Sequence, residues 1–198
     1  MVRKPLIARV RLLAGVSLWF AALGFGRATV AEELPAGKQA IFLARVIAYD
    51  GNLKARAGTT VNIAVLAKKG DRDSEMMADS LTKAFTPLET ATLQGLRVRI
   101  SRLVFGGRDA LDRAVREGGI DALYVCSGLD ANVADIRSVA RAHKVLTMGS
   151  HESHLKLGLS LGVFDINGRN TIVVNLDASR EAGVAFGPEL LRLATVVK

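Results

Sequence analysis

The sequence Val61-Asn62-Ile63-Ala64-Val65-Leu66 is apolar at five of its six positions and rich in β-branched residues. A strand with apolar side chains on both faces is buried on both faces, as the central strands of parallel sheets are. Parallel strands are joined by helical crossovers. This short stretch therefore predicts a layered α/β domain.

Strands and helices alternate along the chain around this strand. Asp73 is a suitable N-cap for a helix in which apolar residues recur at helical spacing as far as Pro87. The segment from Leu96 to Val104 begins with alternating apolar and basic residues, which indicates a strand with one wetter face. Further helices are expected at residues 38–50, 108–117 and 129–140, and further strands at 120–125 and 145–148.

The pattern changes near the C-terminus, where Asn167-Gly168 separates the apolar segments 157–166 and 169–176. An Asn-Gly pair between two such runs is typical of a two-residue β-hairpin. Pro188 favours the first turn of a terminal helix, whose apolar residues continue to Val197. We therefore expect a single α/β domain with a mixed sheet, in which about four parallel strands alternate with helices before a C-terminal antiparallel hairpin and helix.

The first residues have the three-part layout of a secretory signal peptide. Basic residues precede the uncharged run from Leu12 to Phe25, which at 14 residues is too short for a spanning helix. The small residues Thr29-Val30-Ala31 follow, before the first acidic side chains. We expect residues 1–31 to be a cleaved signal peptide, with an uncleaved anchor as the alternative. Residues 32–37 would then be a flexible lead to a periplasmic domain over residues 38–198.

Removal of residues 1–31 changes what the charge of the chain implies. The chain has 27 basic and 19 acidic residues, but five basic residues lie in the removed segment, so residues 32–198 carry 22 basic side chains and a net charge of +3. The only tryptophan, Trp19, is removed as well. A weakly basic chain without tryptophan does not favour nucleic acid. No other segment approaches membrane-spanning length, so we expect no transmembrane segment in the mature chain.

Ligands of open α/β sheets bind near the loops that follow the carboxyl ends of the parallel strands. The loops expected there contain no glycine-rich nucleotide fingerprint. They span residues 67–71, 105–108, 126–130 and 149–154, and the side chains that we expect to line a ligand crevice are Lys68, Lys69, Arg108, Ser127 and His151.

No set of residues in the sequence points to an enzyme or a metal site. The histidines of His151-Glu152-Ser153-His154 are three positions apart, whereas zinc-binding histidines of a zincin helix are four apart, so this segment is expected to be a polar loop. Ser127 lacks the setting of an activated nucleophile. Cys126, the only cysteine, follows a buried strand and is expected in the core, with an intermolecular disulfide in a homodimer as the alternative. We expect no catalysis, cofactor or bound metal.

Several short motifs follow one another over the C-terminal third of the chain. They are Lys144-Val145-Leu146-Thr147, Gly162-Val163-Phe164, Asn167-Gly168-Arg169, Val174-Asn175-Leu176, Ala178-Ser179-Arg180, Ala182-Gly183 and Leu190-Leu191-Arg192-Leu193-Ala194. In order and spacing they resemble the YfiR-like family of periplasmic proteins. The resemblance is close over residues 144–198 and looser over residues 38–143.

The resemblance implies a non-catalytic periplasmic regulator. The type member of the family sequesters the periplasmic sensory part of a membrane-bound diguanylate cyclase and so lowers cyclic-di-GMP synthesis. Members usually carry an aromatic–Trp–Pro ending on the first mature helix, where this chain has Tyr49-Asp50-Gly51, and the better-known members have cysteine pairs that a single cysteine cannot reproduce. The candidate partner contacts are Tyr49, Asp50, Arg169 and Arg192, and the residues expected to be structural are Asn175, Leu190, Leu191 and Leu193.

Two functions therefore compete at this stage. The first is a regulatory binding module that acts on a membrane-bound signalling protein such as a diguanylate cyclase. The second is a periplasmic small-molecule-binding domain that serves transport or sensing and uses the strand-end loops. A neighbouring gene for a cyclase or sensor kinase would favour the first function, and one for a permease or outer-membrane receptor the second.

The secreted protein is expected to begin at Glu32 and to show no tryptophan fluorescence, because Trp19 lies in the cleaved segment. N-terminal sequencing and an emission spectrum of the protein recovered from the periplasm check this prediction. Indole emission from the purified mature protein would contradict it.

Overall fold

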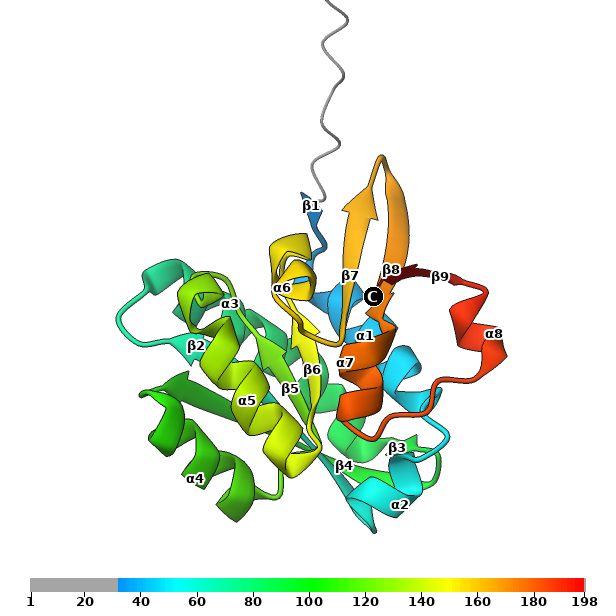
Figure 1. The fold of residues 1–198 in the computed structure, drawn as a ribbon, viewed down its shortest axis with the longest axis horizontal. Helices are drawn as coiled ribbons and strands as arrows, with labels where there is room; N and C mark the ends of the chain where they lie inside the picture. Colours follow the sequence, from blue (N-terminus) through cyan, green and yellow to red (C-terminus); the bar gives the residue numbers. More distant parts are fainter. Residues whose placement is uncertain (1–31, 198) are drawn as a thin grey trace, which may run out of the picture.

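The computed structural model describes residues 32–197. Helices and strands alternate through most of this range (Figure 1). In chain order the elements are β1 Glu32–Glu33, α1 Ala36–Ala48, α2 Leu53–Ala57, β2 Thr60–Lys68, α3 Arg72–Phe85, the 3₁₀ helix Thr86–Thr90, β3 Thr92–Leu93, β4 Leu96–Phe105, α4 Arg108–Gly118, β5 Ala122–Val125, the 3₁₀ helix Asp130–Asn132, α5 Val133–His143, β6 Leu146–Gly149, α6 Glu152–Lys156, β7 Leu161–Ile166, β8 Arg169–Asn175, α7 Leu176–Glu181, α8 Pro188–Leu191 and β9 Ala194–Val197.

The described strands form one mixed sheet in the order β3-β4-β2-β5-β6-β7-β8-β9, with β1 paired to β7. Strands β4, β2, β5 and β6 are parallel neighbours, and β6 also pairs in parallel with β7. Strands β7 and β8 form an antiparallel hairpin. The predicted fold class is therefore confirmed, including the parallel strands and the hairpin.

Strand β2 supplies side chains to two separate cores, because successive residues of a strand point to opposite faces. On one face, Ile63 and Val65 pack in a cluster with residues of α1 and α3. On the other face, Ala64 and Leu66 pack in a second cluster with residues of α4 and α5. Helices α4 and α5 lie in front of the sheet in Figure 1, and α1 and α3 cover the opposite face. This double burial explains why the β2 sequence shows no alternation.

The turn of the β7–β8 hairpin has the geometry that its sequence predicts. Asn167 and Gly168 have φ angles of 56° and 76°. Two consecutive residues with positive φ are characteristic of the type I′ turn, which matches the twist of the flanking strands. The Gly168 N–H also donates a hydrogen bond to Asp165 Oδ1.

Two terminal segments differ from the expectation. The predicted flexible lead at residues 32–37 contains strand β1 and the first residues of α1, and Leu34 is buried in the core. The predicted terminal helix ends at Leu191 and gives way to β9, which pairs in parallel with β8. Long-range pairing of this kind has no local signal in the sequence.

Of the four residues of the C-terminal third that we expected to be structural, three are held in the fold and one is exposed. Asn175 caps α7 by accepting a hydrogen bond from the Ala178 N–H at 3.0 Å, and its amide donates to the Leu155 carbonyl at 3.4 Å. Leu190 is fully buried, and Leu191 packs partly against the core. Leu193 is 69% exposed, so the expectation of a structural role for it is wrong.

Cys126 is fully buried at the end of β5, which agrees with the expected core position. Within residues 32–197, no helix combines the length and apolar character needed to cross a membrane.

Candidate functional site

A groove of about 410 Å³ lies at the carboxyl edge of the parallel strands. It is formed by the first turn of α1, one side of α3, the loop after β5 and the residue before α6. Its lining residues are Ala36, Asp73, Met76, Met77, Ser80, Leu81, Ser127 and His151. This is the edge at which open α/β sheets bind ligands.

The sequence located part of this groove. Ser127 and His151 line it, whereas the basic candidates Lys68, Lys69 and Arg108 do not. Lys68 instead lies near Asp71, with 3.9 Å between its Nζ atom and Asp71 Oδ2. The expectation of a crevice lined by basic side chains is therefore wrong.

The residues that sequence reasoning missed lie on α3. Asp73, Met76, Met77, Ser80 and Leu81 recur at intervals of three or four, so they share one side of the helix. The helical spacing of apolar residues in this segment predicted a helix, but it gave no sign of a groove along one side. Leu81 is buried, but Met76 is 55% exposed, and this partial exposure opens the helix side to the groove.

Met77 connects α3 to the loop after β5. Its Sδ atom accepts a hydrogen bond from the Ser127 N–H at 3.5 Å and lies 3.9 Å from Ser127 Oγ. In both contacts Ser127 is the donor, so the lone pairs of its hydroxyl oxygen are not used. Because sulfur is a weak acceptor, each contact is weak.

The segment after β6 is not the polar loop that we expected. Glu152–Lys156 forms helix α6, and His154 within it is fully buried. Helix α6 packs closely against the end of β6 at Gly149, because a Cβ atom added to Gly149 would lie 2.7 Å from His154 Cβ. Among the described residues, neither ring nitrogen of His154 has a hydrogen-bond partner. Its Nε2 atom lies 3.7 Å from Asp130 Oδ1, which is beyond hydrogen-bond distance.

Burial lowers the pKa of His154, because the charged imidazolium is penalised in the core, although the carboxylate of Asp130 opposes this shift. The ring of His151 lies edge-on to the ring of His154, with 5.6 Å between the two ring centroids. Within the part of the chain that the structure describes, no three acidic, histidine or cysteine side chains are placed to hold a metal ion.

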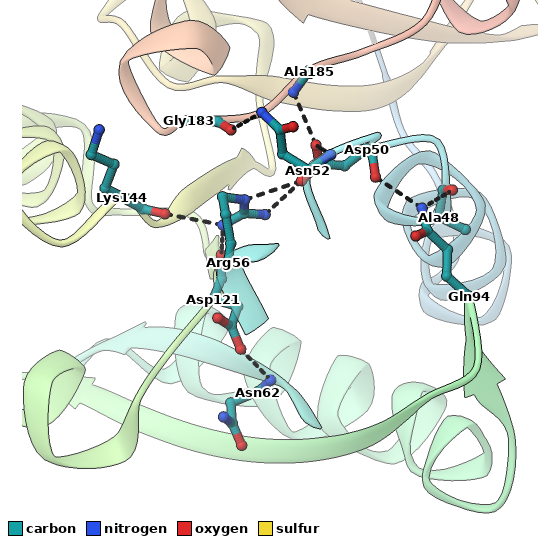
Figure 2. A network of polar contacts seen from close by, with 10 residues as sticks. All are labelled: Ala48, Asp50, Asn52, Arg56, Asn62, Gln94, Asp121, Lys144, Gly183 and Ala185. Atoms are coloured by element: carbon teal, nitrogen blue, oxygen red, sulfur yellow. Dashed lines mark hydrogen bonds and ion pairs between the residues drawn. The ribbon is translucent and has the colours of Figure 1, made fainter. Parts of the chain in front are cut away.

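A second region surrounds the end of α1, where Asp50 is fully buried. Its Oδ2 atom accepts hydrogen bonds from Nε and Nη2 of Arg56 at 3.1 and 2.9 Å. Its Oδ1 atom accepts from the backbone N–H groups of Asn52 and Ala185, both at 2.9 Å (Figure 2). All of these bonds are internal, so the expectation of Asp50 as an exposed partner contact is wrong.

The same network reaches three further segments. Arg56 Nη1 donates to the carbonyls of Lys144 and Asp121, at 3.0 and 3.3 Å. Gln94 Nε2 donates to the carbonyls of Ala48 and Asp50, both at 2.8 Å (Figure 2). The end of α1 is thus tied to the starts of β5 and β6 and to the β3–β4 turn.

The other predicted contact residues, Tyr49, Arg169 and Arg192, are exposed, and Tyr49 shares a face of α1 with two residues that were not predicted, Ile41 and Arg45. Ile41, Arg45 and Tyr49 are four positions apart and lie on the outer face of α1, with Ile41 56% and Tyr49 44% exposed. A hollow of about 440 Å³ is lined by Arg45, Ala48 and Tyr49. Arg169 at the hairpin turn and Arg192 after α8 are exposed too, at separate places.

Comparison with solved structures defines the class of fold. A tryptophan-bound ABC domain from Streptococcus pneumonia superposes with a TM-score of 0.56 at 14% identity, over 82% of this chain and 62% of that one. The ligand-free substrate-binding protein CD0873 from Clostridium difficile gives 0.53 at 15% identity, over 74% and 57%. A conserved domain protein from Vibrio cholerae gives 0.59 at 14% identity, over 83% and 60%. The chain spans about three fifths of the length of these proteins and shares their α/β fold.

The family follows from the sequence itself. The YfiR/HmsC-like family model matches residues 39–195, and the chain belongs to this family. No curated protein matches the sequence. Membership points to a periplasmic regulator.

The buried His154 predicts a loss of stability in acid. The unfolded chain binds a proton on this residue at a pH of about 6.5, whereas the folded chain resists it. The contribution of neutral His154 to the free energy of unfolding is therefore complete above that pH. It is lost as the pH falls from about 6.5 through the lowered folded-state pKa of His154. His154→Leu removes this group, so its free energy of unfolding should fall less steeply between pH 7.5 and 5 than that of the wild type. Denaturant titrations across this range measure both slopes, and parallel slopes would contradict the prediction.

Proposed function

We propose that this protein is a non-catalytic periplasmic regulator that binds the periplasmic sensory domain of a membrane-bound signalling protein, such as a diguanylate cyclase. Its family supports the regulatory role. The single observation that carries the choice of surface is the outer face of α1, where Ile41, Arg45 and Tyr49 are presented beside a hollow.

The composition of this face fits a protein partner. An exposed isoleucine and an exposed tyrosine on one helix provide apolar area that a partner can cover, and tyrosine and arginine are enriched at energetically important interface positions. Lys38, Arg45 and the absence of acidic residues in α1 make the face basic. A partner surface with acidic side chains around an apolar centre would complement it.

Anchoring of α1 supports the same surface. The inner face of the helix is buried in the core, and its end is fixed through Asp50. A rigid helix loses little conformational entropy on binding, so its exposed side chains are preorganised for contact. In this proposal Tyr49 contacts the partner directly, whereas Asp50 acts indirectly by holding the helix end.

The second candidate function is small-molecule binding for transport or sensing. The observation that favours it is the groove at the carboxyl edge of the sheet, with its mixed apolar and polar lining. The two functions use different surfaces, so they can be tested separately.

Ile41→Ser combined with Tyr49→Ala should abolish regulation while leaving the fold intact, because both side chains are exposed. We expect the double variant to reproduce the cyclic-di-GMP level of a deletion strain and to lose at least about tenfold in capture of the membrane partner. Circular dichroism and the unfolding midpoint should match the wild type.

Leu157→Ser serves as the matched control, since Leu157 is 47% exposed but follows α6. The Leu157→Ser protein should restore regulation fully when it is expressed in the deletion strain. The proposal fails if the double variant also complements the deletion, or if the control variant impairs regulation to the same extent.

A further inference from the structure

We propose that the groove at the carboxyl edge binds a small organic ammonium ion with an apolar or aromatic body. This inference goes beyond the proposed regulatory surface on α1, which lies outside the groove lining. It also defines the ligand class for the second candidate function. The groove, at about 410 Å³, has the size of a site for a small molecule.

The charge of the groove selects against anions. Residues 32–198 are basic overall, yet none of the lysines and arginines within residues 32–197 lines the groove. Its ionisable lining residues are Asp73 and His151. Asp73 lies in the first turn of α3, and it makes no hydrogen bond or ion pair with any residue in the described range. Its carboxylate is therefore available to a ligand cation.

The remaining polar groups match an ammonium ion, which has three N–H donors and no acceptor. The hydroxyls of Ser80 and Ser127 can accept hydrogen bonds, and the imidazole of His151 adds a ring nitrogen to the same lining. Each polar side chain in the lining can thus receive a donor from the ligand. A carboxylate ligand would instead face Asp73 and find no cation.

The apolar part of the lining fits the body of the ligand. The apolar side chains of the lining are those of Ala36, Met76, Met77 and Leu81, and the two thioethers are polarisable. Methionine sulfur makes favourable contacts with aromatic rings and adapts to irregular shapes. An amine with an aromatic or extended apolar body would therefore cover Met76, whose side chain is otherwise half exposed.

Three probes of the same shape test the proposal by isothermal titration calorimetry at pH 7.5. They are phenethylammonium, 3-phenylpropanoate and 2-phenylethanol, which carry a positive, a negative and no charge. We expect the wild-type protein to bind phenethylammonium about twofold to fivefold more tightly than 2-phenylethanol, and 3-phenylpropanoate most weakly. Absence of phenethylammonium binding at millimolar concentration would overturn the proposal, as would tighter binding of the anion.

Variants of Asp73 assign the selectivity. Asp73→Asn should bring phenethylammonium to the affinity of 2-phenylethanol, and Asp73→Lys should favour 3-phenylpropanoate. Asp109→Asn is the matched control, because Asp109 occupies the same second position of α4 and does not line the groove. Equal weakening of all three probes by Asp73→Asn would contradict the proposal. We expect the Asp73→Asn protein to restore regulation in a deletion strain, because Asp73 lies outside the proposed α1 surface. The calorimetry therefore tests the ligand site, and the complementation assay tests the regulatory surface.

Discussion

The buried ion pair between Asp50 and Arg56 is the centre of a hydrogen-bond network that joins segments far apart in the sequence. The carboxylate of Asp50 is fully buried and accepts four hydrogen bonds, two from the guanidinium and two from backbone N–H groups. Removing one partner of such a pair leaves an uncompensated charge in the core, which costs about 3–5 kcal/mol. Arg56 also holds the segments that lead into β5 and β6, through the carbonyls of Asp121 and Lys144.

This constraint organises both candidate surfaces. It fixes the C-terminal end of α1, so that Tyr49 projects outward while the next residue points into the protein. The other end of α1 contributes Ala36 to the groove. A change in the position of α1 would therefore alter the proposed partner surface and the groove together. This coupling is geometric, since the helix is packed against β7 and α3 along its inner face.

The elements that follow from local pattern could be predicted from the sequence. The buried run at Val61–Leu66 and the Asn167-Gly168 turn have strong local signals, and both occur as expected. Strand β9 could not be predicted, because its apolar residues also fit helical spacing and its partner β8 lies earlier in the chain. The burial of Asp50 was equally hidden, since one of its partners, Ala185, is 135 positions away.

The candidate groove shows the same limit at the level of single side chains. The strand-end rule located its edge and two of its residues, Ser127 and His151. It could not show that Lys68 turns toward Asp71, nor that one side of α3 forms the wall. The direction of a side chain at a strand end depends on contacts that only the folded chain defines.

The most direct measurement is the free energy of unfolding of Asp50→Ala, Arg56→Ala and their double variant, with Tyr49→Ala as the neighbouring exposed control. The account predicts that each of the two single changes costs about 3 kcal/mol or more, and that the double variant costs much less than their sum. Tyr49→Ala should cost less than about 1 kcal/mol. A loss below about 0.5 kcal/mol for Asp50→Ala, or additive losses for the pair, would contradict the central role of this interaction.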